Sequence, residues 1–573
     1  MKRTLVTLVA AGALAGWLLS LPLQAQPKGG AGAARLDLVE ATVQQLQHAL
    51  QTKLITSEQL VEMYLSRIAA YDEAGPGINA FLHLNSRALA EARQLDALRH
   101  AGRARSPLYG IPVLLKDNID TADMPTTAGS VALAGSVPPD DAFIARKLRE
   151  AGAIIIGKAT LTEFANFLTA GMPTGYSSLG GFGFNPYDPR PDPRPAPLGS
   201  DGRPVLQTGG SSSGSGIGIN ANFAAVAIGT ETSGSILSPA NANGVVGVKP
   251  TVGLVSRDGI IPITADQDTA GPITRTVADA AVLLGAIAGH DPSDAATAAC
   301  LTPGNCFSDY TQFLDKNALK GARLAVFTPA TPLAANRQAL LDAAVARMRA
   351  LGASVRILDV NDIPGQLGTC VTYPLPAAPP PPALRCSAVL LYGFKRDLNA
   401  YLAGTPDAPN NTLTEIVAFN AAFNPPMKYG QTIAVAADQI DLGPNSADTL
   451  RYLADRAEDL VRSRDALNAI YFGPDGVRGT ADDTDAIIAV GNNFAGAPAK
   501  AGFPSVTVPG GFILAGPGDP PINGPFPQTI TFSGPAFSEP RLIALGYAFE
   551  QATKHRVPPG STPPLASDSV SRR

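Results

Sequence analysis

The sequence predicts an α/β fold, in which helices pack against the buried strands of a sheet. Short apolar runs alternate with segments whose apolar residues recur at helical spacing. Hydrophobic residues make up 45% of the 573 residues and charged residues only 16%, which excludes a disordered chain. The formal net charge of -4 has the wrong sign for a protein that neutralises many phosphates, so nucleic-acid binding is not expected.

The N-terminal segment has the layout of a secretory signal peptide. The basic pair Lys2-Arg3 precedes an apolar run over Leu5–Leu23, and a small-residue cleavage site ends at Ala25. We therefore expect residues 1–25 to be removed on export to the periplasm or the medium, with no membrane contact afterwards. An uncleaved N-terminal anchor is the alternative, since the run is nearly long enough to span a bilayer.

After this segment we expect one large domain over residues 38–560. Residues 26–37 are Gly- and Ala-rich and predict a flexible lead-in, and residues 561–573 are expected to form a disordered tail. The stretch 186–204 is dominated by Pro, Arg, Asp and Gly, which indicates an inserted surface loop. Residues 301–499 show few recognisable patterns and form a divergent middle region.

The elements of the domain follow in order along the chain. Residues 38–71 predict two packed helices, and Thr56 and Gln59 can form a capping box at the start of the second, with Ile55 stapled onto Leu60. Further helices are expected at 86–100, 140–151, 337–351 and 448–470, and buried strands at 111–115, 153–157, 223–228 and 245–248.

The four cysteines form two local pairs, Cys300 with Cys306 and Cys370 with Cys386. Three connectivities are open in principle, but each local pairing would close a loop rich in Pro or Gly. In an exported chain these pairs predict two structural disulfides. No pattern indicates a metal: the cysteines lack Cys-x-x-Cys spacing, the histidines lack His-Glu-x-x-His spacing, and the acidic stretch 475–485 lacks the ligand spacing of an EF-hand.

Two small polar clusters and one lysine are the candidate functional groups. The clusters Gly209–Gly216 and Gly229–Ser235 are flanked by core strands, which favours close approach of the backbone to a ligand, although flexible linkers remain the alternative. Lys116 ends the apolar run 111–115. A lysine held in apolar surroundings loses its preference for the charged form and can serve as the base for a serine nucleophile, whereas an exposed lysine is merely solvated.

In chain order, the segments Gly110–Asp117, Gly209–Ser213, Gly229–Ile236 and Gly244–Thr251 resemble the amidase signature family. Within that family, the segments 251–262 and 267–272 are most similar to bacterial peptide amidases. The resemblance covers about 38–289 and returns at 503–509 and 537–553. It implies a single α/β/α domain around a mixed, twisted sheet, and hydrolysis of a carboxamide without a cofactor.

The resemblance also implies a Ser-Ser-Lys triad. Ser235 would be the nucleophile, Ser211 the bridging serine with a cis peptide bond, and Lys116 the base. The backbone N–H groups expected to bind the oxyanion belong to Thr232, Ser233, Gly234 and Ser235. Many family members carry an arginine two residues after the nucleophile, but this chain has Leu237 there, so local support for the nucleophile must differ.

The expected reaction converts a carboxamide to a carboxylate and ammonia or an amine. By resemblance the substrate would be a C-terminal peptide amide, and a small aliphatic or aryl amide is the close alternative. Residues 186–204, which lengthen the segment before Ser211, and the middle region are expected to shape the choice.

Three other interpretations of the sequence compete with this one. Gly210–Gly214 also fits the Gly-x-Ser-x-Gly pattern of a Ser-His-Asp hydrolase with Ser212 as nucleophile, but only His290 and His555 follow it. A catalytically silent binding protein with the same fold is a second. A component of a glutamine-dependent tRNA amidotransferase is a third, and the signal peptide argues against it.

Overall fold

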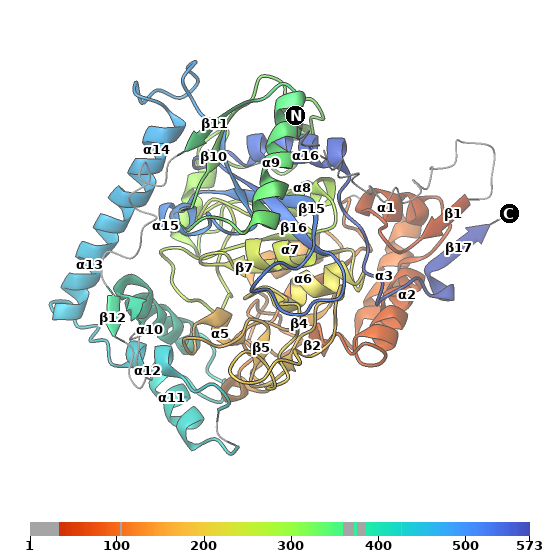
Figure 1. Cartoon of the computed structure of the whole chain (residues 1–573). Helices are drawn as coiled ribbons and strands as arrows, with labels where there is room; N and C mark the ends of the chain where they lie inside the picture. Colours follow the sequence, from red (N-terminus) through yellow and green to blue (C-terminus); the bar gives the residue numbers. More distant parts are fainter. Residues whose placement is uncertain are drawn as a thin grey trace, which may run out of the picture.

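In the computed structural model, an 11-stranded mixed sheet runs through the centre of the molecule (Figure 1). The structure describes residues 34–102, 106–329, 331–358, 372–374, 385–425 and 427–572. The strand order is β11-β10-β14-β16-β15-β8-β9-β7-β3-β4-β2, and parallel and antiparallel neighbours are mixed. The predicted α/β class and mixed sheet are thus confirmed. The strands are β2 (Phe81–Leu84), β3 (Pro112–Lys116), β4 (Ile154–Ala159), β7 (Val226–Glu231), β8 (Val246–Lys249), β9 (Thr269–Thr274), β10 (Arg323–Phe327), β11 (Ser354–Leu358), β14 (Ala486–Val490), β15 (Ser505–Ile513) and β16 (Phe526–Ser533).

Helices cover both faces of this sheet. Every residue of β7 and β9 is buried, because α6 (Ser213–Asn220) and α8 (Val277–Ile287) both pack on these strands. Beside them, α7 (Leu237–Asn243) and α16 (Glu539–Thr553) pack on β15 and β16. The remaining helices of the first half are α1 (Val43–Gln51), α2 (Ser57–Tyr71), α3 (Ala88–His100), α4 (Phe143–Glu150) and α5 (Glu163–Asn166).

The divergent middle region contributes strands to the sheet as well as a helical layer at its side. Its helices α10 to α12 share an apolar cluster with residues 128–172, beside α5 (Figure 1). The expected helix over 448–470 is interrupted, because a π-helical segment, Val461–Asp465, separates α13 from α14. The helices are α9 (Ala335–Ala350), α10 (Ala388–Ala403), α11 (Leu413–Ala422), α12 (Thr432–Asp438), α13 (Ala447–Leu460), α14 (Ala466–Tyr471) and α15 (Gly496–Ala501).

Several local predictions are confirmed in the structure. Thr56 caps α2 with the expected capping box to Gln59, and a second capping box opens α1. A disulfide joins Cys300 to Cys306, as the local pairing predicts. The predicted bond between Cys370 and Cys386 and the predicted signal peptide lie outside the described residues.

The segment 186–204 contains no helix or strand and follows the surface of the domain, as an inserted loop should. Three Asp-Arg pairs at i and i+2 hold its turns: Asp188 with Arg190, Asp192 with Arg194, and Asp201 with Arg203. The hydroxyl of Tyr429 donates to Asp201 Oδ2 at 2.7 Å and so ties the loop to the middle region.

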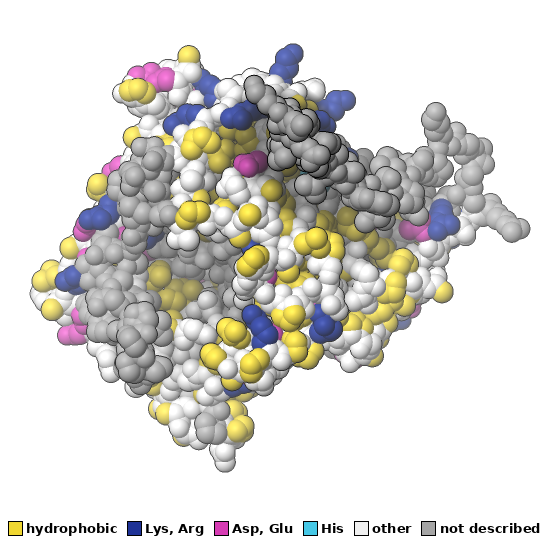
Figure 2. All heavy atoms as spheres, in the orientation of Figure 1, with side chains coloured by type: hydrophobic (Ala, Val, Ile, Leu, Met, Phe, Trp, Pro, Cys, Tyr) yellow, Lys and Arg dark blue, Asp and Glu magenta, His cyan; other side chains and the backbone are white. Residues whose placement is uncertain are grey.

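The described residues on the face seen in Figure 2 show no concentration of positive charge, as the net charge of -4 leads one to expect. Their Lys and Arg side chains are scattered and form no single basic patch. Among the described residues, none of the helices combines the length and apolar character that a bilayer span requires.

The C-terminal residues are ordered against the domain, contrary to the expected disordered tail at 561–573. The strand β17 (Ser569–Arg572) pairs antiparallel with β1 (Ala34–Asp37), so part of the expected flexible lead-in is also a strand. The guanidinium of Arg67 donates to Asp568 Oδ2 at 2.5 Å in a fully buried ion pair. The sequence prediction failed because this tail is short and polar, and its partners lie about 500 residues away in the chain.

Replacing Asp568 by asparagine is expected to lower the free energy of unfolding by about 3–5 kcal/mol. The substitution removes the carboxylate and leaves the buried Arg67 charge without a counter-ion. Urea unfolding of the purified chain measures this change. The exposed pair Arg93–Glu58 supplies the control, since Glu58→Gln should alter stability little. Equal effects of the two substitutions would contradict the expectation.

Candidate functional site

Lys116 lies at the end of β3, and its side chain is completely buried. Its Nζ lies 2.8 Å from Ser211 Oγ and 2.8 Å from Thr230 Oγ1 on β7. Burial lowers the pKa of Lys116 to about 7, although the nearby carboxylates of Asp268 and Glu231 raise it in part. A large fraction of this lysine is therefore neutral near pH 7 and able to accept a proton from a hydroxyl group.

Ser211 reaches Lys116 from the Gly/Ser-rich segment that leads into α6. The Gly210–Ser211 peptide bond is cis, as the family resemblance implies. The backbone of Gly209 has a φ of 67° and lies so close to α7 that a Cβ would sit 2.5 Å from the carbonyl oxygen of Ser238. Small residues are thus required here because two backbone segments meet in the core, which favours the site interpretation over a flexible linker.

Ser235 lies in the turn between β7 and α7, on the same side of the sheet as Ser211. The backbone N–H of Ser212 donates to the carbonyl oxygen of Ser235 at 3.2 Å, so the two serine segments are joined directly. Ser235 is 7% exposed as a residue, in contrast to the completely buried Ser211 and Lys116. Of the three groups, Ser235 is therefore the one that solvent reaches.

The turn that carries Ser235 is held by the carboxylate of Glu231. Its two oxygens accept the N–H groups of Gly234 at 2.7 Å, Ile236 at 2.8 Å and Leu237 at 3.1 Å. This internal carboxylate supports the turn in a chain that has Leu237, and no arginine, two residues after Ser235.

Replacing Glu231 by glutamine is expected to reduce both the melting temperature and kcat. Glutamine has only one side-chain oxygen to accept these N–H groups, and its NH2 group would face N–H donors instead of accepting from them. Each hydrogen bond to the carboxylate that is lost contributes about 1.5–3 kcal/mol. We expect kcat for an amide to fall about 10- to 100-fold as the turn relaxes. Differential scanning calorimetry and steady-state kinetics measure the two effects, and an unchanged kcat would show that the turn holds its shape without the carboxylate.

The expected oxyanion donors are only partly available. Thr232 and Ser233 lie at the end of β7, and the Thr232 hydroxyl donates to Asp268 Oδ1 at 2.5 Å. The N–H of Gly234, however, donates to Glu231 Oε1. An oxyanion would have to share or replace this bond, so the backbone N–H groups of Thr232, Ser233 and Ser235 are the simpler donors.

The alternative nucleophile Ser212 has a structural role. Its Oγ donates to the carbonyl oxygen of Thr230 at 3.1 Å and accepts the N–H of Thr230 at 3.2 Å, and the residue is completely buried. His290 lies 3.3 Å from the Thr297 hydroxyl, and His555 packs near the ring of Phe549. The arrangement does not support a Ser-His-Asp hydrolase.

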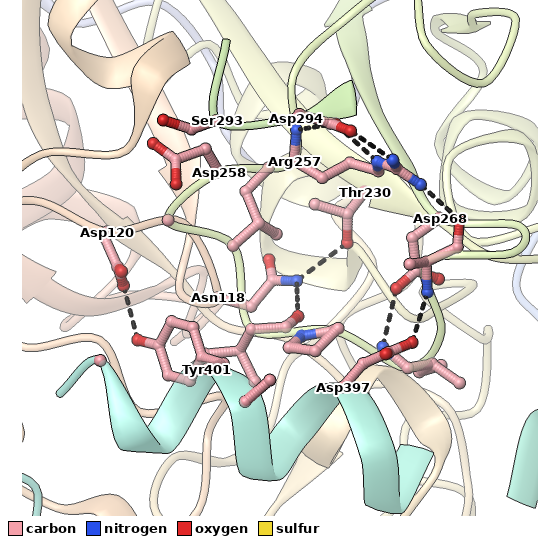
Figure 3. A pocket seen from close by; sticks show the side chains of 18 of the residues that line it. Asn118, Asp120, Thr230, Arg257, Asp258, Asp268, Ser293, Asp294, Asp397 and Tyr401 are labelled. Carbon is pink, nitrogen blue, oxygen red and sulfur yellow. Dashed lines mark hydrogen bonds and ion pairs between the residues drawn. The ribbon is translucent and has the colours of Figure 1, made fainter. Parts of the chain in front are cut away.

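A cavity of about 450 Å³ opens beside this cluster. Thr230 and Thr232 form the wall shared with the cluster, and Figure 3 shows Asn118, Tyr401 and several aspartates around the space. Tyr401 comes from α10, so the divergent middle region contributes to the wall of the cavity, whereas residues 186–204 do not line it. Within the described residues, no group of three or more His, Cys, Asp or Glu side chains is placed to hold a metal ion.

Sequence patterns indicated the two serines and the lysine but missed their polar partners. Thr230, Glu231 and Asp268 make the bonds that orient or tune these groups. The signal for Glu231 was a carboxylate within an otherwise neutral strand that is entirely buried. Asp268 lies 33 residues from Ser235 in the chain, and only the β7–β9 pairing brings it near.

Comparison with known proteins places these features among amide hydrolases. The amidase family matches residues 59–374. A probable amidase of Arabidopsis thaliana is 37% identical over 545 residues, which cover 93% of this chain and 94% of the relative. A glutamyl-tRNA(Gln) amidotransferase component from Acidothermus cellulolyticus is 42% identical, but over only 45% of this chain and 47% of its own length.

Solved structures give the same picture. The peptide amidase from Stenotrophomonas maltophilia is 38% identical and superposes with a TM-score of 0.76, covering 91% of this chain and 99% of that chain. An amidase family protein from Bacillus anthracis is 34% identical with a TM-score of 0.77, covering 91% of this chain and 92% of that chain.

Proposed function

Because this chain belongs to the amidase signature family and is a hydrolase acting on amide C–N bonds, we propose that Ser235, Ser211 and Lys116 carry out the reaction as a Ser-Ser-Lys triad. The hydrogen bond between Lys116 Nζ and Ser211 Oγ in a buried site is the observation that carries this proposal. It links a lysine of lowered pKa to the serine segment that is bonded to Ser235.

The reaction proceeds in two half-reactions. Neutral Lys116 takes a proton through Ser211 as Ser235 Oγ attacks the carbonyl carbon of the amide, and backbone N–H groups stabilise the oxyanion. The protonated lysine then returns a proton to the leaving nitrogen, which departs as ammonia or an amine and leaves an acyl ester on Ser235. Water, activated by the same relay, hydrolyses the ester to the carboxylate and restores Ser235.

The relay predicts an acid limb in the pH profile. The reactive form requires neutral Lys116, and below its pKa of about 7 the neutral fraction falls tenfold for each pH unit. We therefore expect kcat/KM to fall by about 50-fold between pH 7 and pH 5. Because the Asp268 carboxylate raises the pKa of Lys116, Asp268→Asn should move the acid limb to lower pH. A profile that stays flat to about pH 4 would contradict the role of the lysine.

We infer that the substrate is a C-terminal peptide amide or a small aliphatic or aryl carboxamide. The similarity to peptide amidase along 91% of the chain and a cavity of about 450 Å³ support this choice over a role in a tRNA amidotransferase, whose A subunits match 45% to 55% of the chain. Release of ammonia from a panel of amidated dipeptides and simple carboxamides tests it and ranks the classes. No release from any member would overturn the assignment.

We also propose that the chain is exported and that its signal peptide is cleaved after Ala25. The basic start, the apolar run and the small-residue site support this proposal, and the disulfide between Cys300 and Cys306 is typical of an oxidising compartment. N-terminal sequencing of the protein recovered from a fractionated cell tests it.

A further inference from the structure

The cavity beside the proposed triad has a strongly acidic lining. Among the described residues, its wall includes six aspartates, one arginine, Arg257, and no lysine. The guanidinium of Arg257 is held by the protein, since it donates to both oxygens of Asp294, at 2.5 and 2.7 Å, and also to the carbonyl oxygen of Ala265 (Figure 3). Burial raises the pKa of Asp268, and this arginine lowers that pKa in part. It also forms an ion pair with Asp294, but it is one positive charge beside six aspartates.

The other carboxylates divide into bonded and unpaired groups. Asp268 accepts the Thr232 hydroxyl, Asp120 accepts the Tyr401 hydroxyl at 2.8 Å, and Asp397 is paired with Arg396 outside the cavity. Asp140 and Asp258 lie exposed at the rim, and neither forms an ion pair within the described part of the chain. Partial burial raises the pKa of Asp258, and the neighbouring Asp291, Asp140 and Asp294 add to this effect, whereas Arg146 lowers the pKa in part.

A second observation concerns the amide of Asn118, which is 2% exposed and lines the cavity. Its Nδ2 donates to Thr230 Oγ1 at 3.1 Å and to the carbonyl oxygen of Ile261 at 3.2 Å. Its Oδ1 is buried without a hydrogen-bond partner, and in Figure 3 it points away from these two acceptors. A buried acceptor of this kind costs free energy until an N–H donor reaches it.

We propose that this cavity binds the positively charged part of the substrate, an ammonium or guanidinium group, so that the enzyme prefers cationic amides. The proposal rests on the proposed amidase function and adds its substrate class. The cavity offers carboxylates, and the amide oxygen of Asn118 is buried in its wall without a partner. The guanidinium of Arg257 and the hydroxyl of Tyr401 already donate to acceptors of the protein. A group that carries both a positive charge and N–H donors satisfies this lining. The described carboxylates are distributed around the cavity and form no metal-binding group.

The test compares substrates that differ mainly in charge. Glycyl-argininamide is paired with glycyl-citrullinamide, whose neutral urea keeps the length and three of the five N–H donors. Each is used with a free and an acetylated N-terminus. We expect kcat/KM to be at least about tenfold higher for the charged member of a pair, and the ratio to shrink with added salt. The double variant Asp140→Asn, Asp258→Asn should reduce that ratio about three- to tenfold. Glu62→Gln, which removes one exposed charge on α2, should keep the ratio.

Each outcome decides a separate question. Equal kcat/KM for charged and neutral partners, or a ratio that the double variant leaves unchanged, would overturn the charge preference while amide hydrolysis stands. If none of the four amides releases ammonia, the proposed function fails for this class. Calorimetric titration of the same amides into the Ser235→Ala protein then tests the preference alone, and equal dissociation constants for charged and neutral partners would overturn it.

Discussion

Replacing Ser235 by alanine is expected to reduce kcat for amide hydrolysis by a factor on the order of 10^5 to 10^6, with little change in stability. The substitution removes the oxygen that forms the acyl ester, and loss of a serine nucleophile in an unrelated serine hydrolase has an effect of this size. The Glu231 bonds that hold the turn involve only backbone N–H groups, so the turn should persist. Ammonia release and circular dichroism measure the two properties.

Two further serines serve as matched controls for that experiment. Ser86 is exposed near the start of α3, and Ser86→Ala should keep the rate of the parent protein. Ser212→Ala should lower stability, because the buried hydroxyl bridges the N–H and carbonyl groups of Thr230. If Ser212→Ala abolished ammonia release in a folded protein while Ser235→Ala did not, the nucleophile would be Ser212.

The parts of the fold that the sequence predicted are those governed by local patterns. The strands β3, β4, β7 and β8 lie within a few residues of apolar runs, and Thr56 begins α2 as its capping box requires. The C-terminal strand β17 was missed because its partner strand and the Arg67 ion pair lie about 500 residues away. Long-range pairing of a short polar strand leaves no periodic signal in the chain.

The same difference between local patterns and long-range contacts explains which residues of the site the sequence predicted. Lys116 and the two serine segments stand out because each breaks a buried apolar context with small or charged residues. The groups that set their chemistry, Thr230 and Asp268, are ordinary polar residues in the sequence. Their importance comes from the distance to Lys116 Nζ and from the charge they place near it, which only the folded sheet defines.

Removing the proposed base is expected to have the second large effect on the rate. Lys116→Met should reduce kcat/KM at least about 1,000-fold, within the range that general bases contribute. Methionine nearly fills the buried space without a charge, so the fold should be retained. The acid limb near pH 7 should also vanish from the residual rate, because the group that titrates there is gone.

The variant Lys116→Arg tests whether the site needs Lys116 as a proton acceptor or only as a positive charge. Arginine stays protonated and cannot accept the proton that Ser211 relays, so this variant should be as inactive as Lys116→Met. Retained activity would mean that the site needs only a positive charge. The double variant Lys116→Met, Ser235→Ala should be no slower than Ser235→Ala alone, because a base has no role once its nucleophile is removed. Additive losses would instead show that Lys116 acts on a step in which Ser235 has no part.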